Sequence, residues 1–515
     1  VDSIAPHLGV CQAGAPSPPK LAQSETMKLY AAHLDFTTII DEFRLNPTFP
    51  PDVLADAATA TDQHAADRVD ATHIPLVTID PPGSMDLDQA VGITMLDDER
   101  YRVHYAIADP AAFITPGGAL HAESLRRGQS IYLPDQTIRL HPPVLSENKA
   151  SLLPNATRPA ILWTIDLDPA GAWTNYTITR ATVRSRARFT YEETQAAHDT
   201  GTLHPAIAHL PEVGKLLQTS AARRDAITLN FPSQEVQQTS DGLFELIIEP
   251  RLPMMDYNSE ISLLAGRCAG TTMANAGIGI LRTLADPEPT AVSRFWAEAE
   301  HLGYTAHPTS PGEFLRTLDA NTPRGMAIMR EAQKLLRGSE YLDLGANPPR
   351  SHAGVITNND GVRPEYYAQV TAPLRRLADR YATEIVLSLV AETPIPDWVT
   401  CDLEQVLAAM TASGRLAAAV DHACLDYCEA EVLKTFVGHQ FPATVVEVNS
   451  RQKTARVFVD KPPVLADCDY GGASDRAESN TEPSVEPGAE LIEGERYLVT
   501  LSEADPARRV VRFRF

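Results

Sequence analysis

Three aspartates, Asp80, Asp86 and Asp88, lie within nine residues of one another around a Pro-Pro-Gly-Ser turn. Apolar residues directly before and after this stretch predict two buried strands joined by an irregular loop. In an extended segment Asp86 and Asp88 point the same way, while Gln89 points to the opposite face. Clustered carboxylates suit Mg²⁺ or Mn²⁺, which also accept phosphate oxygens of a substrate. The chemistry predicted is phosphoryl transfer or phosphodiester hydrolysis.

The spacing by itself leaves plainer interpretations open, because acidic loops also serve as solvated turns, as Asx-turn caps or as structural Ca²⁺ sites. The stretch TIDPPGSMDLDQA, however, resembles the TIDxxxxxDxDDA signature of the catalytic (RNB) domain in the ribonuclease II and ribonuclease R superfamily. Asp80, Asp86 and Asp88 match the first three acids of the signature, and Gln89 replaces the fourth. The resemblance implies that the three aspartates hold Mg²⁺ or Mn²⁺ and that Asp88 is catalytic. Gln89 would be a weak, neutral ligand.

A second block, YAQVTAPLRRLAD from Tyr367 to Asp379, resembles YxxxTSPIRRYxD of the same family. Pro373 suits the first turn of a helix, where free backbone N–H groups favour a phosphate. The resemblance implies that Arg375 stabilises the scissile phosphate and that Tyr367 and Arg376 contact RNA. The alternative is a surface ion pair between Arg375 and Asp379, worth only about 0.2–0.5 kcal/mol.

Three further positions follow from the resemblance as RNA contacts. Tyr132, in the YLP segment, matches a tyrosine that stacks on bases, an interaction worth roughly 1–3 kcal/mol per base. Tyr191, in RFTY, matches a tyrosine near the base path, and Ile278 replaces a phenylalanine of the base clamp. Aromatic residues in apolar runs are more often core residues, and that interpretation stays open for Tyr132. The His-Arg pair that follows the second block in the family is replaced here by residues 383–384, Thr-Glu.

The elements that must position these residues indicate an α+β fold in three parts. Residues 1–48 are expected to form a small helical module, with a disordered start, about two helices between residues 24 and 45, and a helix-turn-helix-like arrangement as one option. Residues 49–437 are expected to form a large mixed α/β RNB catalytic domain. It would contain a helix at 49–58 and a buried helix at 259–273.

Strand signals are clearest in the catalytic part and at the C-terminal end. Alternation at 101–107 and a hairpin of strands 161–167 and 173–183 are expected in the catalytic domain. Residues 438–515 carry short alternating segments at 441–448, 455–460, 496–501 and 509–515, which predict an OB-fold barrel; the resemblance implies the ribosomal S-one type. An acidic insertion is expected at 467–490, and several arginines and lysines, such as Arg456, Arg508 and Arg512, suggest contacts to RNA backbone.

Composition limits the class of protein. The chain has 515 residues and a formal net charge of -23, which argues against a general nucleic-acid coat and favours a focused site for a single strand. Six scattered cysteines suit a reducing cytoplasm, no membrane span is expected, and we expect a monomer. His422, Cys424 and Cys428 have ligand-like spacing, but no fourth zinc ligand stands nearby, which favours buried helix cysteines.

The resemblance therefore implies a metal-dependent, hydrolytic 3′-to-5′ exoribonuclease that degrades single-stranded RNA to nucleoside 5′-monophosphates. Its cofactor would be Mg²⁺ or Mn²⁺. Two alternatives stay open: a catalytically impaired RNA-binding protein in which Gln89 has disabled a metal site, and a phosphodiesterase acting on short oligonucleotides.

Overall fold

A six-stranded mixed sheet forms the centre of the computed structural model, which describes residues 30–96, 99–229, 233–249, 251–305, 310–319, 322–356, 364–470 and 491–515. Its order is β1-β8-β2-β3-β4-β7, and β7 also pairs with β8, so the strands from β8 to β7 close on themselves. The strands are β1 Val69–Asp70, β2 Leu76–Ile79, β3 Gln89–Met95, β4 Tyr101–Ala108, β7 Thr157–Leu167 and β8 Trp173–Phe189. The hairpin expected from the sequence is β7–β8, with a longer second strand.

Both faces of this sheet are buried, as β4 illustrates. Val103, Tyr105 and Ile107 alternate into the largest hydrophobic cluster, where they meet residues of α7 and α11. Ala106 and Ala108 enter a second cluster with residues of α3 and α4. The covering helices are α3 Pro51–Thr59, α4 Ala119–Arg127, α7 Pro253–Ala276 and α11 Leu377–Val390. The buried helix expected at 259–273 is α7, which extends beyond the predicted ends.

Close packing places the start of the second motif directly against α7. A Cβ atom added to Gly266 would lie 2.4 Å from Tyr367 Cε2 and 2.5 Å from the Ala368 carbonyl oxygen, and one at Gly270 would meet the backbone of Tyr366 at 2.5 Å. Only glycine leaves room for this contact. The chain then runs through residues 371–376 to the start of α11.

Smaller elements surround this core. Three strand pairs were not predicted: β9 Ser233–Gln238 with β10 Phe244–Glu249, β11 Ile280–Thr283 with β12 Glu340–Asp343, and β5 Ile131–Tyr132 with β6 Thr137–Ile138. Helices α8 Pro289–His301, α9 Pro311–Arg316 and α10 Pro323–Gln333 form their own cluster around Phe295 and Phe314. The remaining elements are α5 Tyr191–Asp199, α6 Leu210–Thr219, η2 Pro110–Phe113, η3 Leu145–Lys149, η4 Pro205–Ile207 and η5 Lys434–Phe436.

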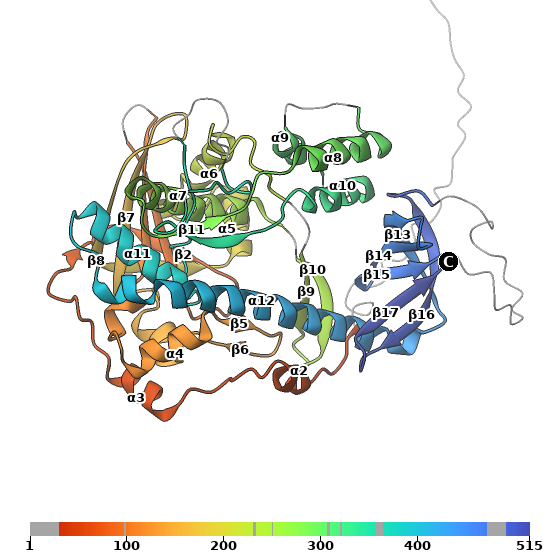
Figure 1. Ribbon diagram of the computed structural model, residues 1–515, viewed down its shortest axis with the longest axis horizontal. Helices are drawn as coiled ribbons and strands as arrows, with labels where there is room; N and C mark the ends of the chain where they lie inside the picture. The colour runs from red at the N-terminus through yellow and green to blue at the C-terminus, as the bar shows by residue number, and fades with distance from the viewer. Residues whose placement is uncertain are drawn as a thin grey trace, which may run out of the picture.

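The long helix α12, Asp397–Leu433, connects the catalytic part to the C-terminal barrel (Figure 1). The barrel is closed in the order β13-β14-β15-β17-β16, which confirms the predicted OB-type architecture. Its strands are β13 Gln440–Asn449, β14 Thr454–Asp460, β15 Pro463–Asp469, β16 Arg496–Asp505 and β17 Val510–Arg514. Strand β15 was missed, and its last residues were wrongly placed in the insertion. Residues 471–490 lie outside the described part.

The N-terminal segment differs from the expected helical module. Of the two helices predicted between residues 24 and 45, the described part contains one, α2 Thr37–Glu42. Phe36 and Ile39 pack against Phe244 of β10 and Val420 of α12, so this segment belongs to the body of the molecule. Residues 1–29 lie outside the described part. Among the described helices, none has the length and apolar character needed to cross a membrane.

Candidate active site

The acidic loop between β2 and β3 is held in place from both sides. Leu87 is fully buried, and its side chain belongs to a core cluster, so the residues before and after it face the other way. Ser151 Oγ accepts from the Leu87 backbone N–H at 3.0 Å and donates to the Met85 carbonyl at 2.7 Å. The Asp88 carbonyl accepts from the Ala108 backbone N–H at 2.8 Å. This anchoring fixes where the flanking carboxylates lie.

Asp80 follows the end of β2, and its backbone N–H donates to the Phe189 carbonyl of β8 at 3.0 Å. Its Oδ2 atom is buried and has no hydrogen-bond partner. Burial raises the pKa of Asp80 to about 6, although the positive charges of Arg375 and Arg188 act in the opposite direction. A buried carboxylate oxygen without a partner is costly, which indicates that a cationic ligand belongs here.

Asp86 and Asp88 lie beside Arg375. Burial raises the pKa of Asp86, and it raises that of Asp88 well above its ordinary value. Asp88 Oδ1 accepts from the Leu374 backbone N–H at 2.8 Å, and Asp88 Oδ2 lies 3.5 Å from Arg375 Nε. Arg375 thus lies beside buried Asp88 and partly buried Asp86, and a divalent cation would offset the negative charge that the three aspartates concentrate here.

The adjacent arginines of the second motif have different partners. Arg375 is 46% exposed and turns toward Asp88. Arg376 instead binds Asp379 through Nε at 3.0 Å and Nη2 at 2.7 Å. Asp379 has no exposed side-chain surface and also accepts from the Ala372 backbone N–H at 2.7 Å. The alternative pairing of Arg375 with Asp379 is therefore wrong. Arg376 holds the motif in shape through this pair, and the RNA contact expected of it stays a prediction.

Gln89, the position that departs from the family signature, uses its amide within the protein. Its Nε2 donates to the Thr371 carbonyl at 2.7 Å. Its Oε1 accepts from Tyr105 Oη at 2.7 Å and from Ser262 Oγ at 3.4 Å. Tyr105 Oη and Ser262 Oγ also lie 2.6 Å apart, so these two hydroxyls and the Gln89 amide form one hydrogen-bonded group, and Gln89 could bind a metal only by disturbing it. We assign it a structural role between β3, α7 and the second motif.

The two tyrosines expected on the RNA path both lie near the carboxylates. Tyr132 is 48% exposed, and its Oη donates to Asp86 Oδ2 at 3.4 Å, so its ring is accessible for stacking. Partial burial raises the pKa of Tyr132 to about 12. Burial also raises the pKa of Tyr191, and the negative charge of Asp80 raises it further. Tyr191 Oη accepts from Asn258 Nδ2 at 3.5 Å.

Tyr367 and Ile278 are placed differently. Tyr367 packs against Gly266 of α7, and its ring meets the His352 ring edge-on at a centroid distance of 5.3 Å. Ile278 follows the end of α7, with its backbone N–H bonded to the Met273 carbonyl at 3.2 Å. No contact recorded among the described residues joins Ile278 to Tyr132, so the expected clamp stays a prediction.

The residues present fit a hard divalent cation, although they do not form a complete cage. Within the described ranges, no group of three or more His, Cys, Asp or Glu side chains already converges as a metal cluster. A Mg²⁺ site needs only one or two protein carboxylates, because water and substrate phosphate supply the other ligands. Asp80, with its unpartnered oxygen, and the neighbouring Asp86 and Asp88 provide that donor set. The three residues with zinc-ligand spacing do not come together: His422 is exposed, whereas Cys424 and Cys428 are buried in hydrophobic clusters.

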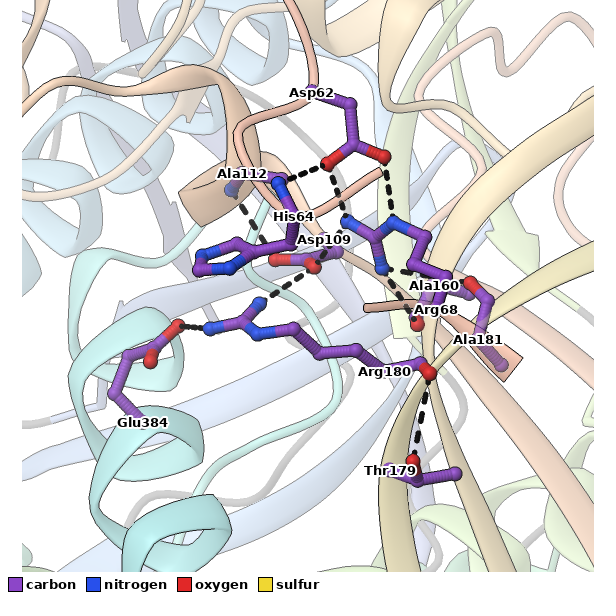
Figure 2. A network of polar contacts seen from close by, with 10 residues as sticks. All are labelled: Asp62, His64, Arg68, Asp109, Ala112, Ala160, Thr179, Arg180, Ala181 and Glu384. Atoms are coloured by element: carbon purple, nitrogen blue, oxygen red, sulfur yellow. Dashed lines mark hydrogen bonds and ion pairs between the residues drawn. The ribbon is translucent and has the colours of Figure 1, made fainter. Parts of the chain in front are cut away.

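A buried ionic network links the sheet to helix α11 (Figure 2). Asp109 accepts from Arg68 at 2.8 Å and from Arg180 at 2.7 Å, and Arg180 also pairs with Glu384 of α11. Arg68 is further bound by Asp62 at 2.6 Å. Glu384, one of the two residues that replace the His-Arg pair of the family pattern, is thus paired with Arg180 on β8. Reasoning from the sequence missed this network, since its members are scattered over more than 300 positions.

Many of the barrel arginines expected to grip RNA are paired with acids. Glu503 binds Arg508 and lies 3.8 Å from Arg512. Arg456 lies 3.6 Å from Asp467, and Arg509 pairs with Glu42 near α2. These pairs lower the positive charge that the barrel offers to a phosphate backbone.

Comparisons with known proteins identify relatives over most of the chain. The family model described as RNB domain matches residues 68–392. Ribonuclease R of Chlamydia trachomatis is 27% identical over 448 residues, which cover 83% of this chain and 61% of that protein. The chain therefore spans less than two thirds of that relative.

Solved structures share the fold. Mycoplasma genitalium RNase R, in a complex with ribose-methylated single-stranded RNA, superposes with a TM-score of 0.79 at 18% sequence identity. The superposed region covers 93% of this chain and 77% of the RNase R chain. Yeast Ssd1, described as a pseudonuclease, gives a TM-score of 0.63 at 16% identity and covers 79% and 51%. The same fold thus occurs in a protein named as a nuclease and in one named as a pseudonuclease.

Proposed function

We propose an activity for this chain, which belongs to the ribonuclease II and ribonuclease R superfamily of RNB-domain proteins. It is a hydrolytic exoribonuclease that degrades single-stranded RNA from its 3′ end and releases nucleoside 5′-monophosphates. The observation that carries this proposal is the meeting of Asp88 with Arg375. The Leu374 N–H and the Arg375 guanidinium both contact Asp88, so two motifs 286 residues apart form one site.

Within this site the side chains divide the work. Arg375, half-exposed and held beside Asp88, is placed to donate to the scissile phosphate and to stabilise charge in the transition state. Tyr132 presents an exposed ring beside Asp86 on which a base can stack. Asp379 and Arg376 keep the backbone around Ala372 in the conformation that directs Arg375 toward the carboxylates.

A divalent cation is part of the proposal. Asp80, Asp86 and Asp88 would hold Mg²⁺ or Mn²⁺, as the unpartnered Asp80 oxygen supports. When bound, such an ion supplies a Lewis acid that activates water and offsets charge on the phosphate.

The test is to incubate the protein with 5′-labelled single-stranded RNA in Mg²⁺, Mn²⁺ or chelator, with Asp88→Asn as the matched control. A metal-dependent ladder that shortens from the 3′ end and is absent in the control is expected. A series of substrate lengths separates this activity from a phosphodiesterase restricted to short oligonucleotides, which would leave long RNA intact.

The engaged amide of Gln89 favours one second candidate, an RNA-binding protein without cleavage. Replacement of the fourth acid removes a negative charge that could hold a second cation. The same experiment separates the candidates. Intact RNA that nevertheless shifts on a native gel, in both Mg²⁺ and Mn²⁺, would support the binding protein and contradict the exonuclease.

A further inference from the structure

A cavity of about 570 Å³ lies next to the carboxylate site and is used by none of the residues discussed so far as catalytic. It is formed by the end of β8, one side of α5 and the loop that leads into η4. Its volume falls within the range of ligand pockets, roughly 300–1,000 Å³. Its lining includes Arg188, Phe189, Glu193, Ala197, Thr202 and His204.

The cavity and the carboxylate site share a wall. Phe189 lines the cavity, and its carbonyl accepts the Asp80 backbone N–H at 3.0 Å. Arg188 also lines it, and is paired in register with Thr78, two residues before Asp80. Arg188 Nη1 lies 4.0 Å from the sulfur of Met85 in the acidic loop. A molecule released at Asp80 therefore needs to move past only one strand end to enter the cavity.

The lining chemistry matches a nucleotide. Arg188 forms no ion pair with a carboxylate among the described residues, although its charge acts on nearby Asp80, so its guanidinium keeps donors for a phosphate. Phe189 and His204 form a tilted ring pair with centroids 5.8 Å apart, which offers an aromatic surface to a base. His204 Nδ1 accepts from the Ala206 N–H at 3.2 Å, so the neutral ring carries its proton on Nε2, as a donor.

One acid lines the same cavity and does not oppose this assignment. Glu193 is exposed, and its Oε2 accepts from the Thr190 backbone N–H in the capping box of α5. This bond directs one carboxylate oxygen to the helix start. The other polar wall residues, Thr194 and Thr202, are neutral, and their hydroxyls already bond within the protein, Thr194 Oγ1 to the Thr190 carbonyl at 2.7 Å and Thr202 Oγ1 to Thr200 Oγ1 at 2.9 Å.

We propose that this cavity binds a nucleoside 5′-monophosphate, the product of the cleavage proposed above, with its phosphate at Arg188 and its base against Phe189 and His204. The description of this nucleotide as a reaction product rests on the proposed function. The proposal that the cavity binds a nucleotide does not. Occupation of the cavity would hold the released nucleotide apart from the carboxylates.

Direct binding tests the proposal without RNA cleavage. Adenosine 5′-monophosphate and adenosine are titrated into the full chain by calorimetry, in chelator so that no metal-bound phosphate contributes. Ala197→Trp fills the cavity from its α5 wall, and Ala196→Trp, on the adjacent exposed position of the same helix, is the matched control. Arg188→Gln removes the positive charge and keeps a polar, unbranched side chain.

We expect adenosine 5′-monophosphate to bind at least about tenfold more tightly than adenosine, because adenosine lacks the charge-assisted bonds to Arg188. Ala197→Trp should weaken this binding at least about tenfold, Ala196→Trp should leave it unchanged, and Arg188→Gln should abolish the preference over adenosine. Equal binding by the two tryptophan variants would place the nucleotide elsewhere and overturn the inference.

The RNA assay distinguishes the two proposals. If RNA is shortened but the nucleotide does not bind in the cavity, the exonuclease stands and the further inference fails. If the nucleotide binds as expected but no RNA is cleaved under any metal condition, the cavity is a nucleotide site and its description as a product site is overturned.

Discussion

At the residue scale, the site depends on which partner each polar group has. Arg375 and Arg376 are neighbours in sequence, yet one faces the carboxylates beside Asp88 and the other is bound to buried Asp379. Gln89 resembles a displaced metal ligand in the sequence, yet its amide joins Thr371, Tyr105 and Ser262. Roles assigned by motif therefore need checking against hydrogen-bond partners.

The two arginines should respond differently to the same substitution. Arg375→Gln is expected to lower kcat about 100-fold or more, by loss of a donor to the transition state, and to cost only about 1 kcal/mol of stability. Arg376→Gln leaves buried Asp379 without its cation and is expected to destabilise by about 3–5 kcal/mol. Single-turnover kinetics and urea unfolding of both variants measure the contrast. Similar losses of stability in the two variants would contradict the assigned roles.

Gln89→Met tests the structural role of the amide. The variant keeps the side-chain volume but removes the Gln89 partner of the Thr371 carbonyl and of Tyr105 Oη, which retains Ser262 Oγ, so we expect a loss of about 1–3 kcal/mol. Urea unfolding in chelator measures this loss free of any metal effect. A variant as stable as the wild type in chelator, but needing a higher metal concentration for activity, would instead make Gln89 a ligand.

At the element scale, short anchors hold the reactive segments against rigid elements. The acidic loop is fixed to residues 151–152 after η3, and the second motif lies between α7 and the start of α11. Helix α12 joins this assembly to the barrel and carries a buried carboxyl group, Glu429, near the barrel strand β15. A group of this kind makes the junction sensitive to pH.

Burial raises the pKa of Glu429 to about 7, while Gln234 Nε2 donates to its Oε1 at 2.7 Å. A raised folded-state pKa means that the folded protein holds this proton more tightly than the unfolded chain. Its contribution is therefore fully present below the unfolded pKa and is lost as pH rises toward about 7. The loss amounts to about 3 kcal/mol at most.

Glu429→Gln removes this titration and keeps the shape. We expect the variant to match the wild type near about pH 5 and to be more stable near about pH 8. Other buried acids titrate equally in both proteins, so the difference in unfolding free energy between them isolates Glu429. An unchanged difference across this pH interval would show that Glu429 stays charged in the folded protein.

At the scale of the whole molecule, the net negative charge differs from the positive charge expected of a general RNA-binding protein. The net charge is -23, and in the barrel Glu503 binds Arg508 and approaches Arg512. RNA affinity should then come mainly from the focused site around Arg375 and Tyr132. The barrel can contribute more only if its arginines are released from their acidic partners.

Glu503→Gln, introduced into an Asp88→Asn background so that RNA stays intact, should release two arginines. Each new phosphate contact steepens the dependence of log K on log salt by about 0.7 for a single strand, so we expect a change of up to about 1.4. Fluorescence anisotropy of labelled RNA across a salt series measures the slope. Glu404→Gln, an exposed site on α12, removes the same charge; an equal slope in both variants would reflect net charge alone.

Much of the architecture followed from local pattern. Alternating side chains predicted β4, the hairpin β7–β8 and four of the five barrel strands, because a strand that buries one face must repeat every second residue. The acid spacing placed Asp86 and Asp88 on one side, and buried Leu87 between them confirms that geometry. Strand β15 was missed because it runs directly into an acidic, polar stretch that obscured its alternation.

The sequence by itself determined which chemical groups are present and how neighbours along the chain are oriented, since these depend on backbone geometry within a few residues. Only the tertiary structure decided which distant groups pair. Leu374 meets Asp88, Gln89 meets Thr371, and Phe189 separates the carboxylates from a cavity, all through packing across large sequence separations. Such pairings depend on the simultaneous burial of several elements, which no local pattern records.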